Sequence, residues 1–249
     1  MKDVIILGAG VGSRLRPLTD SVPKLLVEVS GKTILGRALE ILLPSAEVRS
    51  VTIVVGYRGD QIESATKDLS QKIKIVRNHS YEQTNNMHSL YLALATLDMK
   101  HDVVIMNGDC VYDPAVLREA ISGGGDAIFA DGAYPVNDES MHVDIDANGI
   151  IRGIAKPPQM KSMPIGQLVV SIDLYRLSAQ QLPDFYEIID TFQKRGARQQ
   201  WTELALDSLL RHKARTNSAI KANDIAGKMW MEIDNNEDLE KANARFQGT

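Results

Sequence analysis

Residues 4–14 read Val4-Ile5-Ile6-Leu7-Gly8-Ala9-Gly10-Val11-Gly12-Ser13-Arg14, an apolar run followed by a loop with three glycines. Consecutive apolar residues are typical of a strand that is covered on both faces. A glycine loop after such a strand leaves backbone N–H groups unshielded by Cβ atoms, so an anion can approach them. Because the cations Arg14 and Lys24 follow, the segment predicts a binding site for phosphate groups.

Two common phosphate-binding motifs do not fit this loop. The dinucleotide fingerprint requires a third glycine where this chain has Ser13, and Pro23 disfavours a helix leading to the acidic Glu28. The P-loop of kinases would need a glycine at Leu26, ahead of Ser30-Gly31-Lys32-Thr33. A tight turn of an unrelated α/β protein explains the glycines but not the two cations and two prolines that accompany them.

The glycine loop, followed by Arg14, Pro17-Leu18-Thr19 and Pro23-Lys24, resembles the signature of the sugar-nucleotidyltransferase superfamily. Members join a nucleoside triphosphate to a phosphorylated acceptor and release pyrophosphate. The resemblance implies that Arg14 holds the β- and γ-phosphates and that Lys24 stabilises the α-phosphate as it is attacked. It also implies nucleotide contacts at Leu7, Gly8, Ala9, Gly10, Gly12, Ser13, Arg14 and Gly108.

Composition limits the other classes of function. The net charge of -4 and the pI near 5.8, without a basic cluster, argue against a nucleic-acid partner. The apolar runs are too short to cross a bilayer, so we expect no membrane span. Cys110 is the only cysteine, which excludes an intrachain disulfide, and Met1 leads into a strand without a signal peptide. We therefore expect a cytoplasmic protein.

Strand and helix signals alternate through the first half of the chain, which predicts an α/β fold. We expect three layers, α/β/α, around a Rossmann-like, mostly parallel but mixed sheet. The 249 residues suffice for a single domain, with residues 1–130 binding the nucleotide and residues 131–249 binding the acceptor and completing the metal site. The predicted strands are 4–7, 51–55, 73–76, 103–106 and 127–130, and the predicted helices are 34–43, 61–69, 90–97 and 114–121.

The pattern changes in the second half. Residues 142–146 alternate in polarity, Asn148-Gly149 is a hairpin turn, and 150–155 return. This predicts a small antiparallel element on the acceptor side. A strand at 165–172 should lead through Asp173-Leu174-Tyr175 into further helices. The remaining predicted elements are helices at 182–192 and 202–210 and strands at 218–222 and 229–233.

Asn85 and Asn86 precede a predicted helix. Such asparagines are often caps and turns, but a side-chain amide can also read the edge of a nucleotide base. With Ser89-Leu90-Tyr91 they resemble a segment of bacterial CTP:phosphocholine cytidylyltransferases and of relatives that activate phosphonates or other small phosphoesters. The resemblance implies that Asn85, Asn86 and Ser89 bind the nucleotide and that CTP is the donor.

Acidic residues suggest a magnesium site. Asp109 follows a predicted strand, and a carboxylate there can reach a Mg2+ ion that also holds triphosphate oxygens. The superfamily has a metal-binding aspartate in this motif and a second one in a strand-to-helix setting like that of Asp234. Glu232, two residues earlier, lies on the same face of its strand and is the third candidate ligand. Asn235 should cap the final helix with Asp238 three residues later.

The acceptor site is less determined by the sequence. By resemblance, Lys156 of the Lys156-Pro157 step contacts the acceptor phosphate, and Gly166 and Glu203 are further candidates. The segment after Ala130 offers Tyr134 but no nearby tryptophan, and an aromatic face is what a quaternary ammonium requires. We therefore expect a phosphonate, a phosphoamino compound or a sugar 1-phosphate rather than phosphocholine.

The favoured function is that of a Mg2+-dependent cytidylyltransferase acting on CTP and a small phosphorylated acceptor. A sugar-1-phosphate nucleotidyltransferase using UTP, GTP or dTTP is the enzyme alternative, and a nucleotide-sensing regulatory domain is the non-enzyme alternative. The scattered histidines lack metal-ligand spacing, and His88 is expected at the surface. Cys110 is expected to be buried rather than nucleophilic. The sequence is compatible with an oligomer but does not determine its size.

Overall fold

The structure is a computed structural model that describes residues 1–156, 166–215 and 219–248. Its strands are β1 (Lys2–Gly8), β2 (Glu28–Val29), β3 (Lys32–Thr33), β4 (Val48–Val55), β5 (Ile73–Arg77), β6 (Val103–Asn107), β7 (Cys110–Tyr112), β8 (Ala127–Asp131), β9 (His142–Ile145), β10 (Ile151–Ala155), β11 (Gln167–Leu177), β12 (Lys221–Asp224) and β13 (Trp230–Glu232). Its α-helices are α1 (Ile34–Leu42), α2 (Gly59–Thr66), α3 (Asn86–Leu94), α4 (Pro114–Ser122), α6 (Leu182–Lys194), α7 (Thr202–Arg215) and α8 (Asn236–Arg245).

A nine-stranded mixed sheet forms the centre of the molecule. Its main path is β10-β9-β11-β6-β1-β4-β5, while β8 pairs with β11 and β12 pairs with β8. The strands β6, β1, β4 and β5 run parallel, because helical crossovers connect them. β11 is antiparallel to β6, β8 and β9. The predicted α/β class with a mixed sheet is confirmed, and the antiparallel β9–β10 hairpin continues the main sheet.

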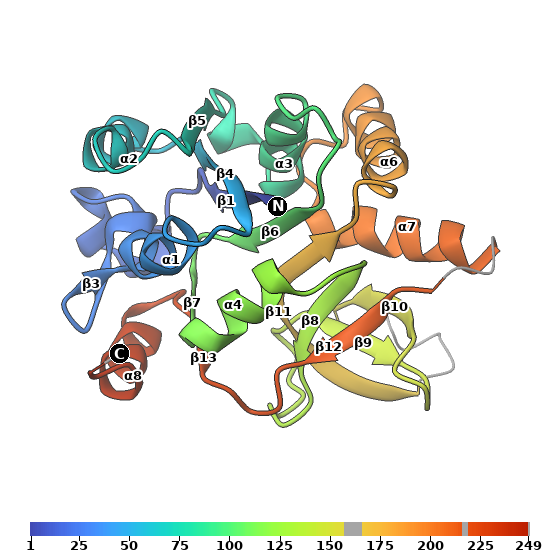
Figure 1. The fold of residues 1–249 in the computed structure, drawn as a ribbon. Coiled ribbons are helices and arrows are strands. Elements are labelled where there is room, and N and C mark those ends of the chain that lie inside the picture. The colour runs from blue at the N-terminus through green and yellow to red at the C-terminus, as the bar shows by residue number, and fades with distance from the viewer. Residues whose placement is uncertain (157–165, 216–218, 249) are drawn as a thin grey trace.

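The side chains of β1 alternate between the two helical layers. Val4 and Ile6 pack into the core that includes residues of α1, α2 and α4. Ile5 and Leu7 pack into the opposite core, which includes residues of α3, α6 and α7. Strand residues point alternately to the two faces of a sheet, so an uninterrupted apolar run is needed when both faces are covered. The result is the expected three-layer arrangement (Figure 1).

β11 is longer than predicted. We expected the strand to end at Ile172, but it continues to Leu177, because Leu174 and Tyr175 are buried in the two opposite cores. The pairing of β11 with β8 is irregular between Ser171 and Tyr175, and Asp173 in that interval has a left-handed backbone with φ of 57°. Such irregularities re-aim side chains and occur next to active sites. The predicted starts at Ile165 and Ser218 lie outside the described residues.

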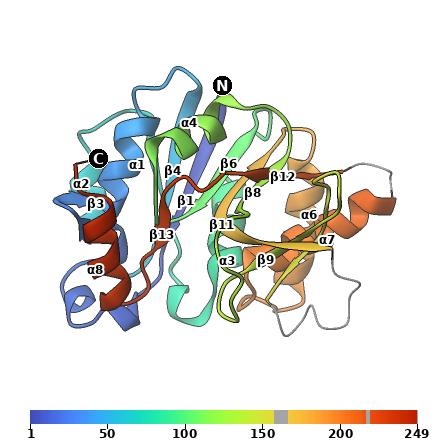
Figure 2. The same ribbon diagram turned by 90° about the horizontal axis from the view of Figure 1, so that it is seen from below.

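The C-terminal helix closes the molecule against the N-terminal loops. Residues of α8 share a small core with Leu15, Val27 and Ile34. α8 lies at one end of the molecule and α7 at the other in both views (Figures 1 and 2). Just before α8, β13 pairs with β7 in antiparallel fashion, which brings residues near 232 beside residues near 110. Within the described part of the chain, no helix has the length and apolarity needed to cross a membrane.

Candidate active site

A cavity of about 1270 Å³ lies at the carboxyl ends of β1 and β6. Ligands of open α/β sheets bind at this edge. Segments from both halves of the chain line the cavity, and these include most of the residues that the sequence analysis singled out. The predicted site residues in its lining are Leu7, Ala9, Gly10, Arg14, Asn85, Asn86, Ser89, Asp109, Lys156, Glu203, Glu232 and Asp234.

Several predicted site residues are not among the residues that line the cavity. A Cβ atom on Gly8 would overlap the Leu25 side chain, and one on Gly108 would lie 2.7 Å from the carbonyl oxygen of Leu7. These two glycines therefore allow close packing between β1, β6 and the segment around Leu25. The predicted residues outside the described lining are Gly8, Gly12, Ser13, Lys24, Gly108 and Gly166. The acceptor contact of Gly166 and the nucleotide contacts of the other five residues stay predictions.

Lys24 joins the two halves of the site. Its Nζ donates hydrogen bonds to Asp109 Oδ2 at 3.1 Å and to Asp234 Oδ1 at 3.0 Å. Burial alone would lower the pKa of Lys24, but the attraction of both carboxylates is stronger, and the pKa lies above its ordinary value. Arg14, from the glycine loop, places Nη2 2.7 Å from Asp234 Oδ2. Two cations and two acids thus meet at the rim of the cavity.

The capping of α8 fixes Asp234 in this cluster. Asn235 accepts a hydrogen bond from the Asp238 N–H at 3.0 Å, and the Asp238 carboxylate accepts from the Asn235 N–H at 3.2 Å. This is the predicted capping box. The same carboxylate accepts from the Asp234 N–H at 3.1 Å. Burial would raise the pKa of Asp234, but Lys24 and Arg14 outweigh it, so the pKa is lowered.

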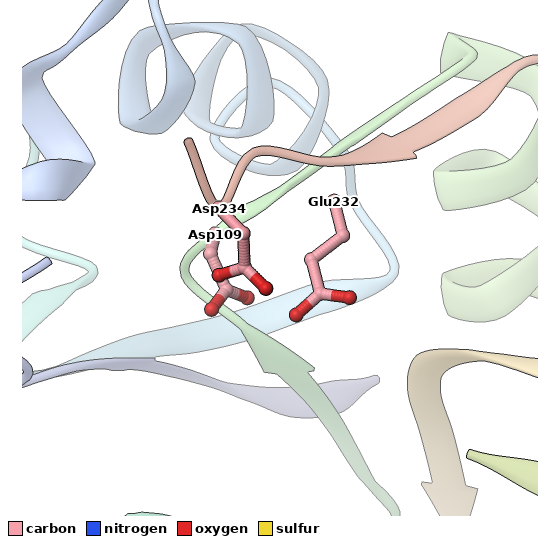
Figure 3. Close-up of side chains that lie close together, drawn as sticks. All are labelled: Asp109, Glu232 and Asp234. Carbon is pink, nitrogen blue, oxygen red and sulfur yellow. The ribbon is translucent and has the colours of Figure 1, made fainter. Parts of the chain in front are cut away.

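Asp109, Glu232 and Asp234 form a group of carboxylates that could hold a metal ion (Figure 3). Each offers one oxygen, and the three oxygens lie within 4.8 Å of one another. Mg2+ binds oxygens at about 2.0–2.1 Å in octahedral geometry, so its ligand oxygens are separated by about 3–4 Å. Glu232 is exposed at the cavity surface, but desolvation by its surroundings, with the charges of Asp109, Asp173 and Asp234, raises its pKa to about 9. This oxygen-only set fits a hard divalent cation.

Asn85 and Asn86 lie at the start of α3. In each side chain one polar atom bonds within the protein and the other has no partner among the described residues. Asn85 Oδ1 accepts from the Asn86 N–H at 2.7 Å, so the predicted capping role of Asn85 is confirmed. Asn86 Oδ1 accepts from the Thr202 N–H at 2.8 Å. Neither amide nitrogen, Nδ2, has a hydrogen-bond partner among the described residues, although both residues line the cavity. The cap also starts α3 at Asn86, four residues before the predicted start at Leu90.

A second acidic cluster lies in the cavity lining, with Glu203 buried and Asp173 half-buried, and Asp173 was not among the predicted site residues. Asp173 and Glu203 both line the cavity, and the Tyr175 hydroxyl lies 3.0 Å from Asp173 Oδ1 and 2.8 Å from Glu203 Oε1. A hydroxyl has one proton to donate, so one carboxyl must supply the other. Burial, with the charges of Glu203 and Asp109, raises the pKa of Asp173 to about 8. Burial also raises the pKa of Glu203.

The side chain of Asn107 completes this cluster. Its Nδ2 donates to Asp173 Oδ2 at 3.1 Å, while its buried Oδ1 has no partner within the described residues. We call Asn107, Asp173 and Glu203 the acceptor floor, after the phosphorylated acceptor that Glu203 was predicted to bind. These three side chains offer the cavity hydrogen-bond acceptors and carboxyl groups. A single signal for Asp173 was present in the sequence: an acidic residue inside the apolar run 168–175.

Aromatic side chains also line the cavity. Trp201 is 41 % exposed there, and the Lys156 ammonium lies 4.9 Å from the centroid of its ring. Trp230 donates through Nε1 to Asp131 at 3.0 Å, and its ring centroid is 5.3 Å from that of Tyr134. The expectation that no tryptophan lies near Tyr134 was wrong. Trp230 lies nearly a hundred residues after Asp131 of β8 in the sequence. The pairing of β12 with β8 and of β13 with β7 brings the two together, and their positions in the sequence do not reveal this contact.

The acceptor contact predicted for Gly166 stays a prediction, whereas the expected surface position of His88 is wrong. Gly166 is outside the described cavity lining, and its N–H donates to Asp144 Oδ1 at 2.7 Å, at the start of β11. His88 is buried rather than at the surface, because its Nδ1 lies 2.7 Å from Gln193 Oε1 of α6. Cys110 is buried, and burial raises the pKa of its thiol, which agrees with the predicted unreactive role.

Comparison with protein families identifies the family to which the chain belongs. The family model described as nucleotidyl transferase matches residues 3–247. The chain belongs to the nucleotidyl transferase family. This membership confirms the resemblance drawn from residues 8–24.

Individual relatives include cytidylyltransferases. The chain is 26 % identical over 244 residues to the bifunctional IPC transferase and DIPP synthase of Aquifex aeolicus, and spans 51 % of that protein's length. It is 29 % identical over 260 residues to the CTP:phosphoglutamine cytidylyltransferase of Campylobacter jejuni, covering 96 % of this chain and 98 % of that one. The crystallised CTP:phosphocholine cytidylyltransferase of Streptococcus pneumoniae superposes with a TM-score of 0.74 at 21 % identity, over 98 % of this chain and 99 % of that one.

Proposed function

We propose that this protein is a Mg2+-dependent cytidylyltransferase that transfers CMP from CTP to a small phosphorylated acceptor carrying a cationic nitrogen. A phosphate or phosphonate oxygen of the acceptor attacks the α-phosphorus in line, and pyrophosphate leaves. The observation that carries the proposal is the composition of one cavity: its lining includes Arg14 and the acids that bond Lys24, the amides of Asn85 and Asn86, and the acceptor floor.

The amide donors support cytosine as the base. The Oδ1 atoms of Asn85 and Asn86 each already accept one backbone hydrogen bond, so the N–H groups of Nδ2 are the polar groups of each side chain that have no partner among the described residues. Cytosine presents two neighbouring acceptors, O2 and N3, whereas uracil presents an N3–H donor at the second place. Sites built to hydrogen-bond one analogue reject another by leaving buried polar groups unpaired. Two donors therefore favour CTP over UTP.

The clamp supports transfer at the α-phosphate. Such chemistry needs positioning and charge neutralisation more than covalent help, since negative charge accumulates on both reactants. Arg14 would hold the β- and γ-phosphates, and Lys24 would hold the α-phosphate. Asp109, Asp234 and Glu232 would hold Mg2+, which when bound neutralises triphosphate oxygens. Lys24 reaches both aspartates in the described structure, so it is already within side-chain reach of the place where the metal-bound phosphates would lie.

The acceptor floor supports a cationic nitrogen. Buried carboxyls whose pKa values are raised gain most from a positively charged partner, because it offsets the loss of hydration. The partnerless Oδ1 of Asn107 adds an acceptor for an N–H donor. Trp201 and Trp230 offer aromatic faces, which attract cations. Lys156 lies in the same lining and would orient the acceptor phosphate.

A sugar 1-phosphate is the alternative acceptor. Its hydroxyl groups could also donate to the acceptor floor, but neutral donors compensate two buried acids less than an ammonium group does. A nucleotide-sensing domain without chemistry would have no use for Arg14, Lys24, Asp109 and Asp234 together. The products distinguish both alternatives from the proposal: a sugar 1-phosphate would give a sugar nucleotide, and a nucleotide-sensing domain would give no product.

The decisive experiment measures pyrophosphate release with each of the four nucleoside triphosphates and a panel of acceptors. The panel pairs 2-aminoethyl phosphate with 2-hydroxyethyl phosphate, which differ only in the cationic group, and adds phosphocholine, 2-aminoethylphosphonate and glucose 1-phosphate. We expect turnover with CTP, and a kcat/KM at least about tenfold higher for the amine than for the alcohol. Preference for glucose 1-phosphate or for UTP would contradict the proposal.

A further inference from the structure

The start of α7 is attached to the start of α3. The Thr202 N–H donates to Asn86 Oδ1 at 2.8 Å, and the Asn85 N–H donates to the carbonyl of Arg198 at 2.9 Å. α3 packs against both α6 and α7. Two adjacent residues on the base side of the cavity therefore hold the segment that leads into the acceptor side.

This contact replaces a missing helix cap. The first N–H groups of a helix have no partner within the helix, and a side-chain oxygen normally accepts from them. The residue before α7 is Trp201, whose side chain is only a donor. Asn86 supplies the acceptor from another helix. Oδ1 is engaged in this way, whereas Nδ2 of Asn86 has no partner among the described residues and can donate to a ligand.

The residues on either side of Thr202 belong to the acceptor side. Trp201 lies in the cavity wall with its ring beside Lys156, and Glu203 is a buried member of the acceptor floor, bonded to Tyr175. Both belong to the same helical turn, so their positions depend on where α7 begins. A shift of this turn would move the floor and the aromatic wall together.

We infer that Asn86 is a positioning residue that couples the two substrate sites. Its Oδ1 fixes the start of α7, and with it Trp201 and Glu203, while its Nδ2 faces the base; this rests on the proposed function. Loss of the oxygen should weaken binding of the acceptor, and loss of the amine should weaken binding of CTP. One side chain thereby links recognition of the nucleotide to the geometry of the acceptor site.

Two substitutions separate the oxygen from the amine. Asn86→Asp keeps an oxygen that can accept from Thr202 and removes the N–H donors, whereas Asn86→Ala removes both. With CTP saturating, we expect Asn86→Ala to raise the KM of the acceptor about tenfold, the size of effect that loss of a helix cap produces. Asn86→Asp should leave the acceptor KM within about twofold of wild type and raise the KM of CTP.

Asp113→Ala is the matched control. Asp113 caps α4 through a 2.8 Å bond from the Ala115 N–H and lies outside the described cavity lining. It should lower the thermal midpoint about as much as Asn86→Ala does, with both KM values unchanged. Equal increases of the acceptor KM in Asn86→Asp and Asn86→Ala, or an unchanged acceptor KM in Asn86→Ala, would overturn the inference.

Failure of the proposed function would look different. If the panel identifies another nucleotide or another phosphorylated acceptor, the choice of substrates is wrong, but the same two KM values measured with that pair still test the coupling. Rescue of the acceptor KM by Asn86→Asp would then support the inference. If the panel confirms CTP and the amine while Asn86→Asp gives no rescue, the coupling fails and the proposed function stands.

Discussion

The backbone N–H of Ile233 donates a 2.8 Å hydrogen bond to the carbonyl oxygen of Asp109. This single bond ties the end of β13 to the residue that precedes β7. Asp234 follows Ile233 directly, so its carboxylate reaches the same ammonium group as that of Asp109. The spacing of the two acids is therefore set by the backbone, and their orientation is set by Lys24 and by the capping box of α8.

Replacement of either acid should abolish turnover without unfolding the protein. We expect Asp109→Asn and Asp234→Asn each to lower kcat about a thousandfold, because a bound metal contributes several kcal/mol of charge stabilisation. Pyrophosphate release measured over a Mg2+ titration checks this. Asp60→Asn, at an exposed acid of α2 paired with Arg77, is the control and should retain wild-type turnover. Retention of most of the rate in either site variant would show that the metal assignment is wrong.

Lys24→Met should expose the mutual repulsion of the acids that Lys24 neutralises. The Lys24 side chain is mostly buried, and removing one partner of a largely buried ion pair leaves charge uncompensated. We expect a loss of about 2 kcal/mol in the free energy of unfolding in metal-free buffer, allowing for partial exposure of both aspartates. Denaturant unfolding measures this.

Added Mg2+ should restore part of that stability, because an ion that binds only the folded state stabilises it. Turnover should stay low, since the α-phosphate would have lost its cation. Wild-type protein should gain less from Mg2+ in the same titration. If Mg2+ stabilises the two proteins equally, Lys24 and the metal do not share the acids.

Local signals in the sequence predicted the first half of the fold well. The run 4–7 and the glycine loop specify a buried strand and its turn through steric rules that act over a few residues. The capping box at Asn235 is equally local, and it was predicted and confirmed. The boundary of β11 was wrong because Asp173 looked like the end of a strand, while the packing of Leu174 and Tyr175 on distant elements carried the strand onward.

The acceptor side could not be predicted because its residues meet only through tertiary pairing. Trp230 of β13 contacts Tyr134, and Tyr175 connects Glu203 with Asp173. The spacing of these residues in the sequence predicts neither contact. The amide of Asn86 could be read as a base contact or as a cap. The sequence could not show that its oxygen caps a different helix, because that partner is over a hundred residues away.

Asn85→Asp should weaken the preference for CTP. The carboxylate can still accept from the Asn86 N–H, so α3 keeps its cap, but the donors toward the base are lost. We expect kcat/KM for CTP to fall about a hundredfold, as when a polar site is mismatched to its ligand, and kcat/KM for UTP to fall less. Steady-state kinetics with both nucleotides checks this. An equal fall for both would show that Asn85 does not read the base.

The stability of the ligand-free protein should depend on the titration of Asp173. Its pKa is about 8 in the folded state, against an ordinary value of 3.8. Between these values the folded carboxyl keeps a proton that the unfolded chain releases. The contribution of Asp173 is therefore fully present below about pH 4 and is lost as pH rises through 8, with a limiting slope of about 1.4 kcal/mol per pH unit.

Asp173→Asn isolates this contribution, because the amide does not titrate and has nearly the same shape. In metal-free buffer, the free energy of unfolding of the wild type should fall steadily relative to that of the variant from pH 5 to pH 8. Glu232 and Glu203 also have raised pKa values, and because both interact with Asp173 through charge, the difference includes this coupling as well as the titration of Asp173 itself. Saturation with 2-aminoethyl phosphate should reduce the wild-type pH dependence, because a bound ammonium favours the ionised carboxylate. A pH-independent difference would show that Asp173 is ionised in the folded protein.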